Sequence, residues 1–197
     1  MKFLPLSVAV LGLAALSGCV APVGPVQVTR FHVPDVTPLG KGAIAVEPAP
    51  GVDGKSLEWQ TYQIAVQRQL TLLGYSQAEA GQGAQVAELR LAKSMSDPAR
   101  RSGPISVGVG GSTGSYGGGL GIGLGFNLGG GPRQQVQTEL GVMIKDRASA
   151  HTLWEGRASF DVDAKSPLAD TALAAPKMAE ALFKDFPGQS GATIEVK

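Results

Sequence analysis

Residues 135–162, QVQTELGVMIKDRASAHTLWEGRASFDV, decide the fold of this chain. Apolar and polar residues alternate in two runs, 135–145 and 153–162, and this is the period of a half-buried strand. The polar sequence 146–151 joins the two runs. Two alternating runs on either side of a short polar segment predict an antiparallel hairpin.

Further strands are indicated on both sides of this hairpin. Alternation predicts strands at 26–33, 42–47 and 86–95, and a last one at 192–196. The first two strands each end at a proline, Pro34 and Pro48. We therefore expect a sheet that is mostly antiparallel.

Two helices are expected between the strands. The first begins after Ser56, a good N-cap, and ends at Gly74; the second runs over about 170–186 and ends before Pro187. The residues expected to face inward are Trp59, Ile64, Val66, Leu70 and Leu73 in the first helix and Leu173, Met178, Leu182 and Phe183 in the second. The fold class is therefore α+β, an antiparallel-rich sheet packed by two helices.

The N-terminal segment is typical of a bacterial secretion signal. Lys2 precedes a short apolar run at residues 3–16, and the sequence Leu-Ser-Gly-Cys closes the segment at Cys19. The run is shorter than the roughly 20 residues that cross a bilayer. Leu-Ser-Gly-Cys resembles the lipobox of bacterial lipoproteins, which implies removal of residues 1–18. The resemblance also implies that Cys19 carries a diacylglycerol and an N-acyl chain.

The sole cysteine supports this expectation, because acylation disposes of a thiol that would be unpaired in an exported protein. Val20 follows Cys19. In the enterobacterial lipoproteins that this segment resembles, an Asp at that position keeps the protein in the inner membrane. We therefore expect an anchor in the outer membrane, with the protein facing the periplasm. Residues 19–25 are expected to form a tether, and residues 26–197 a single α+β domain.

Composition limits the classes of partner. The chain is 43% hydrophobic and 17% charged, with a net charge of +1. It can bury a core, but it lacks the basic excess that attracts nucleic acid. No nucleic-acid partner and no cofactor besides the acyl chains are expected.

Three stretches carry a resemblance to a known family. They are LLGY at 72–75 leading to AELRL at 87–91, LWEGRA at 153–158, and LFKDFP at 182–187. They are similar to the lipoprotein family described as domain of unknown function 4136. The family has no agreed biochemical function, so the resemblance implies a fold and a cellular location. The sequence departs from the family pattern at Glu88, where Asp is more typical, and in a weak opening strand.

The sequence APGVDGKS at 49–56 satisfies a relaxed Walker A pattern. Pro50 has no N–H group for a phosphate, and the Asp53 carboxylate would repel one. We therefore favour a turn in which Gly51 and Gly54 adopt positive φ and Ser56 caps the helix. The candidate nucleotide contacts of the alternative are Gly54, Lys55 and Ser56.

Other chemistry-bearing residues are interpreted as structural. His32 and His151 are the only histidines and are expected at the surface, so no metal cluster is predicted. Asp161 and Asp163 share a strand face, where such charges are usually solvated. Trp59 and Trp154 are expected to pack the core. A non-enzyme is expected; the alternative is an envelope enzyme, either nucleotide-handling or a hydrolase with a dispersed site.

The glycine-rich insertion at 103–131 is the distinctive feature of the sequence. Glycine alternates with apolar residues, which suits either a low-complexity loop or two extended arms of a hairpin. A hairpin would add to a partner's sheet or lie on lipid. The candidate contacts are Leu120, Ile122, Leu124, Phe126, Leu128, Arg100, Arg101 and Arg133.

Together these observations predict an outer-membrane-anchored lipoprotein that acts as a non-catalytic binding or envelope-organising module. The expected partners are the membrane, through the anchor, and either an envelope protein or a second copy of the chain.

Overall fold

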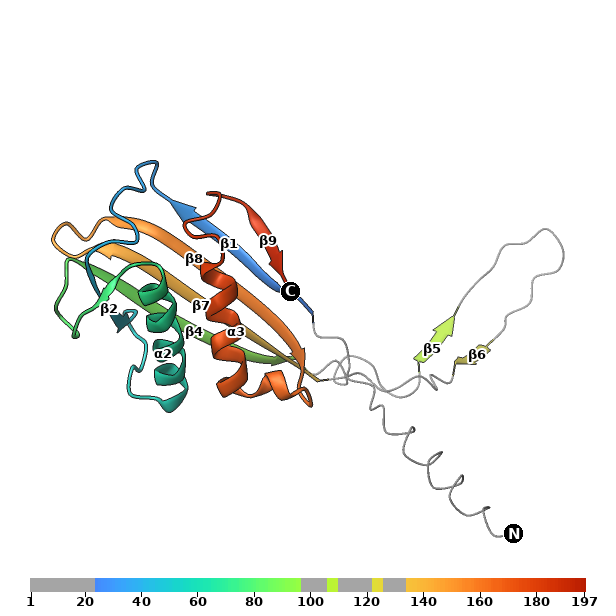
Figure 1. Cartoon of the computed structure of the whole chain (residues 1–197). Coiled ribbons are helices and arrows are strands. Elements are labelled where there is room, and N and C mark those ends of the chain that lie inside the picture. Colours follow the sequence, from blue (N-terminus) through green and yellow to red (C-terminus); the bar gives the residue numbers. More distant parts are fainter. Residues whose placement is uncertain (1–23, 97–105, 110–121, 126–133) are drawn as a thin grey trace, which may run out of the picture.

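A computed structural model describes residues 24–96, 106–109, 122–125 and 134–197. Its elements are β1 (Val26–His32), β2 (Ala43–Pro48), α2 (Leu57–Leu72), β3 (Ser76–Gln77), β4 (Gln85–Ser96), β5 (Ser106–Val109), β6 (Ile122–Gly125), β7 (Gln135–Asp146), β8 (Thr152–Asp163), η2 (Pro167–Ala169), α3 (Thr171–Phe183) and β9 (Thr193–Val196). Seven strands form one sheet in the order β3-β2-β4-β7-β8-β1-β9, and α2 and α3 cover one of its faces (Figure 1). The expected α+β class is confirmed.

The predicted hairpin is the centre of the sheet. β7 and β8 pair antiparallel from Gln135 opposite Asp163 to Ile144 opposite Trp154, with a register shift after Ile144. β4 pairs with the other side of β7 over its whole length. The parallel pairs are those of β2 with its two neighbours, β3 and β4. The helical connection α2 lies between β2 and these strands, and it lets the chain return in the same direction.

Alternate residues of these strands form the core against the helices. Trp154, Phe160 and Met178 are almost completely buried, and the Trp154 ring stacks on Phe183 with centroids 5.4 Å apart. The expected packing of Trp59 and Trp154 is confirmed. Burying each side chain of this size contributes roughly 1.5–3 kcal/mol, so this layer holds the helices to the sheet.

Two expected core residues are exposed instead. Ile64 is 70% exposed because Trp59, Tyr62, Val66 and Leu70 form the buried stripe of α2, and Ile64 is about 200° around the helix from Tyr62. Leu173 is 49% exposed. The first buried residue of α3 is Ala174, one position later.

The end of α3 also differs from the expectation. The helix stops at Phe183 rather than Phe186. Lys184 is extended and Asp185 has a φ of 56°, so the backbone leaves the helical conformation before Pro187.

The described parts of the insertion are extended. β5 and β6 form a separate antiparallel pair in which Val107 lies opposite Leu124 and Val109 opposite Ile122. This pairing agrees with the two-arm interpretation at those eight positions. Within the described ranges, no helix is long and apolar enough to cross a membrane.

Candidate functional site

The candidate site is the end of the sheet at which the expected tether and the insertion join the domain. Ser96, the last residue of β4, lies opposite Gln135, the first residue of β7, so the two strands that precede and follow the insertion are adjacent at these ends. Asp163 at the end of β8 lies opposite the same Gln135. Gly24 leads into β1 beside β8, since a Cβ there would lie 3.8 Å from the Asp161 carbonyl oxygen. We call this region, defined by Gly24, Ser96, Gln135 and Asp163, the exit end (Figure 1).

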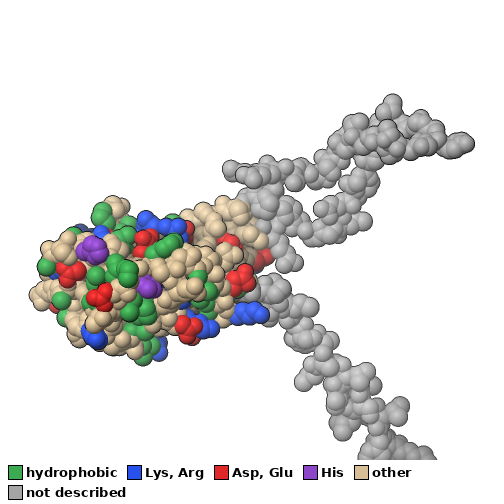
Figure 2. Space-filling view, turned by 90° about the horizontal axis from the view of Figure 1, so that it is seen from above, with side chains coloured by type: hydrophobic (Ala, Val, Ile, Leu, Met, Phe, Trp, Pro, Cys, Tyr) green, Lys and Arg blue, Asp and Glu red, His purple; other side chains and the backbone are tan. Residues whose placement is uncertain are grey.

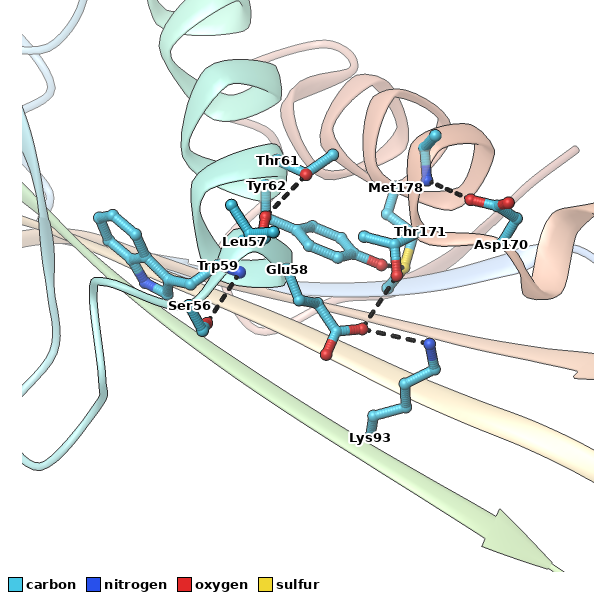
Figure 3. A network of polar contacts seen from close by, with 11 residues as sticks. Ser56, Leu57, Glu58, Trp59, Thr61, Tyr62, Lys93, Asp170, Thr171 and Met178 are labelled. Carbon is cyan, nitrogen blue, oxygen red and sulfur yellow. Dashed lines mark hydrogen bonds and ion pairs between the residues drawn. The ribbon is translucent and has the colours of Figure 1, made fainter.

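A polar contact joins both helices to the sheet near the exit end (Figure 3). The Glu58 carboxylate in the first turn of α2 accepts a hydrogen bond of 2.9 Å from the Thr171 hydroxyl, the first residue of α3. The same oxygen lies 3.1 Å from the Lys93 ammonium of β4. Both helices therefore begin near the exit end, where their N-terminal dipoles favour the carboxylate of Glu58.

Three large apolar side chains that are exposed lie within two residues of the members of this contact. Leu57 is 81% exposed and precedes Glu58, while Met95 is 67% exposed and follows Lys93 by two residues on the same strand face. Leu173, two residues after Thr171, is the third. Exposed apolar residues that gather in one place are typical of contact surfaces.

Tyr62 lies in the core beneath this contact. Its hydroxyl is 3.7 Å from the Met178 sulfur, and burial raises the pKa of the phenol strongly, with the negative charge of Glu58 adding to the effect. The phenol therefore stays neutral at physiological pH. Tyr62 packs α2 against α3 and supplies no acid or base.

The Walker-like segment is a closed turn. The Val52 N–H donates to the Ala49 carbonyl at 3.0 Å, and the Lys55 N–H donates to the Asp53 carboxylate at 2.9 Å. Ser56 caps α2, as expected, by accepting from the Trp59 N–H. The N–H groups of Val52 and Lys55 are thus engaged within the turn and do not face a phosphate.

The two glycines of this turn have different roles. Gly51 has a φ of 83°, as expected. Gly54 does not have positive φ, so that expectation is wrong. A Cβ at Gly54 would lie 2.9 Å from the Pro48 ring, and close packing explains the glycine.

The histidines do not meet. His32 is half-buried rather than at the surface: Nδ1 lies 2.8 Å from the Val33 carbonyl and Nε2 3.2 Å from that of Gly188. His151 is exposed at the β7–β8 turn. In the described ranges, no group of three His, Cys, Asp or Glu residues is placed to hold a metal.

Surface charges of both signs are interspersed among apolar and uncharged residues on the face seen in Figure 2. Asp161 is exposed, as expected for a solvated face, whereas Asp163 is half-buried and accepts a 2.9 Å hydrogen bond from the Lys165 N–H. This face carries no field of a single sign.

Most predicted contact residues lie outside the described part of the chain. Ile122 and Leu124 are placed by backbone only, in β6. Those outside are Cys19, Arg100, Arg101, Leu120, Phe126, Leu128 and Arg133.

Sequence reasoning missed Arg30. It is only 3% exposed, and its guanidinium donates to the Leu182 and Ala181 carbonyls at 3.0 and 3.1 Å. Burial lowers the pKa of the group, while the nearby Asp185 carboxylate opposes the shift. In a strand that alternates polar and apolar residues, the sequence carries no signal that an arginine lies inside.

Comparisons with known proteins give a family and a fold. A family model described as "Domain of unknown function (DUF4136)" matches residues 43–188. An uncharacterized protein of Zymomonas mobilis is 27% identical, over 88% of this chain and 80% of the relative.

Two solved structures are similar in shape. A PDZ domain protein from Parabacteroides distasonis has a TM-score of 0.50 at 11% identity, over 88% of this chain. The match spans only 39% of that protein's length. The PelC dodecamer from Paraburkholderia phytofirmans has a TM-score of 0.46 at 9% identity, over 84% of this chain and 99% of that one. At 11% identity, the similarity to the Parabacteroides distasonis protein concerns the fold alone.

Proposed function

Since this chain belongs to the DUF4136 family, whose description assigns no activity, we propose a function from its own residues. The protein is a lipoprotein of the outer membrane, anchored by acylated Cys19. Its domain binds or organises an envelope component by non-catalytic contact with protein or lipid. The observation that supports the proposal is the exit end, where Gly24, which follows the expected tether, lies at the same end of the sheet as Ser96 and Gln135, which flank the glycine-rich insertion.

Chain length ties the exit end to the membrane. Gly24 is five positions after Cys19, and these five steps of chain span at most about 18 Å. An acyl anchor at Cys19 therefore keeps the exit end near the bilayer surface. The exposed Leu57, Met95 and Leu173 lie at this end, where an apolar contact suits them.

The alternative function is an envelope enzyme. A nucleotide-handling activity would use Gly54, Lys55 and Ser56, whose turn is closed by its own hydrogen bonds. A thermal-shift panel with nucleotides, metal ions and lipids separates the two classes, because a ligand of the native state raises stability.

The first test concerns the anchor. Mass spectrometry of the native N-terminal peptide is expected to find acylated Cys19. An unmodified thiol, or a Cys19→Ser protein that still fractionates with salt-washed membranes, would refute the anchor.

The second test concerns the insertion. Residues 103–131 are replaced by a short Gly-Ser connector, and separately by a Gly-Ser segment of the original length. Both variants should fold, because β4 and β7 pair directly and closing a shorter loop changes the free energy by only about 0.6 kcal/mol per halving. Circular dichroism checks folding, and pull-down or liposome flotation without the lipid anchor measures association.

Both variants are expected to lose association. The variant of original length separates the effect of sequence from that of length. If both fold and associate as well as the wild type, the insertion is only a loop and the binding role is refuted.

A further inference from the structure

A groove of about 290 Å³ crosses the sheet face that the helices leave open. It lies over the middle of β4, β7 and β8, beside the turn at Ala49 and Pro50. The groove is about six residues, or roughly 20 Å, from the exit end along β4. Its charged walls come from Glu88, Arg90, Lys145, Glu155 and Arg157.

Gly141 forms the floor of the groove. In the sheet register it lies between Arg90 of β4 and Arg157 of β8. A Cβ at Gly141 would be 3.6 Å from Nη2 and 3.7 Å from Nε of Arg90, which is ordinary contact. An alanine would therefore fit. Glycine inside a central strand weakens the strand and often marks a close approach by a ligand.

Among the described residues of this face, Lys145, Arg147 and Arg157 have carboxylate partners. Lys145 lies 2.7 Å from Glu88, and Arg147 makes a 2.6 Å ion pair with Glu47. Arg157 lies 3.3 Å from Glu139 and 3.9 Å from Glu155.

Arg90 is the exception. It is exposed and makes no hydrogen bond or ion pair with any residue of the described ranges. Its guanidinium lies directly over Gly141, at ordinary contact distance from where a Cβ would be. A planar fork of donors is thus free in the wall of the groove.

We propose that Arg90 binds a carboxylate in the groove, beside Gly141. A guanidinium and a carboxylate form two parallel hydrogen bonds, which a single ammonium cannot match. The volume is close to the lower limit of small-ligand pockets, so it suits a small acid or the acidic end of a longer chain. Glu88 and Glu155 lie in the walls and disfavour a dianionic phosphate more than a singly charged carboxylate.

The site does not depend on the anchor or the insertion. A negative result here therefore leaves the proposed function standing, and the reverse also holds.

The test uses the full chain in detergent and saturation-transfer NMR, which detects the protons of a bound ligand. One arm uses N-acetyl-dialanine, a peptide carboxylate, and another uses glucuronate, a sugar carboxylate. Inorganic phosphate serves as the competitor. Binding of either acid supports the site and shows which source it prefers.

Four variants locate the binding. Gly141→Val puts methyl groups where the Arg90 guanidinium lies, and Arg90→Gln removes the charge, so each should weaken binding at least tenfold. Arg90→Lys keeps the charge but loses the fork, and an intermediate, several-fold loss is expected. Arg68→Gln, at an exposed arginine of α2, is the matched control and should bind like the wild type.

Stability measurements accompany the binding data. Gly141→Val should keep the fold, because valine favours strands and the exposed Arg90 side chain can move away from the added methyl groups. If Gly141→Val fails to fold, the test is the difference in acid binding between Arg90→Gln and Arg68→Gln. The proposal is overturned if neither acid binds at millimolar concentration, if Arg90→Gln binds as the wild type does, or if phosphate displaces the acids at equal concentration.

Discussion

Arg30→Met tests whether the buried arginine holds the end of α3. Methionine has a similar length and fills the space, but it cannot donate to the Leu182 and Ala181 carbonyls. These carbonyls belong to the last turn of the helix, where no later N–H of α3 reaches them. The substitution therefore leaves two acceptors without their donor.

The expected loss is about 3 kcal/mol of unfolding free energy. Each hydrogen bond from a charged donor contributes roughly 1.5–3 kcal/mol. Removing a buried charge returns part of the sum, because its desolvation cost disappears. Arg30→Lys keeps one charge but not the fork, so we expect it to lose about half as much.

Urea denaturation at neutral pH measures the loss as a shift of the midpoint at constant slope. Arg68→Met is the matched control and should change the free energy by no more than about 0.5 kcal/mol. A loss below about 1 kcal/mol for Arg30→Met, or one equal to the control, would refute the assigned role.

Three further predictions concern single residues. Gly156→Ala should cost about 3 kcal/mol in urea denaturation, because its Cβ would lie 2.2 Å from the buried Trp154 ring; a change below about 1 kcal/mol contradicts this. Burial alone would raise the pKa of Glu47, but the Gly81 N–H and the Arg147 guanidinium outweigh it and hold the pKa below its ordinary 4.5. The resulting stabilisation is present above about pH 4.5 and lost as pH falls through the lower folded-state pKa; Arg147→Gln should reduce it, measured by urea denaturation across that pH series. Lys55→Ala should leave stability within about 0.5 kcal/mol and the cellular role intact; saturable ATP binding that this variant abolishes would instead favour the enzyme alternative.

Periodicity predicted the elements of this fold better than the faces they bury. The hairpin, the capped start of α2 and the last strand lie close to where the sequence indicates. Ile64 was misplaced because the aromatic Tyr62 occupies the inward face, and two apolar residues two positions apart cannot share one helix face. The two-residue β3 is too short to show any period.

The sites were harder to predict because they depend on strand register. The exit end joins residues from four strands that are far apart in sequence, and only the pairing of Ser96 with Gln135 and of Gln135 with Asp163 brings them together. The groove depends on register in the same way, because Arg90 and Arg157 lie on either side of Gly141 in the sheet. Sequence alone shows one glycine in a strand and two arginines in others.

The placement of the chain ends has a practical consequence for labelling this protein in cells. Val196 pairs with Val26, so an epitope or fluorophore fused after Lys197 would emerge beside the tether. With the proposed anchor at Cys19, such a fusion would lie close to the bilayer. The β7–β8 turn, where Ser149 and His151 are exposed, lies at the end of β7 and β8 that is opposite the exit end. A short label inserted there stays accessible and leaves the exit end unobstructed.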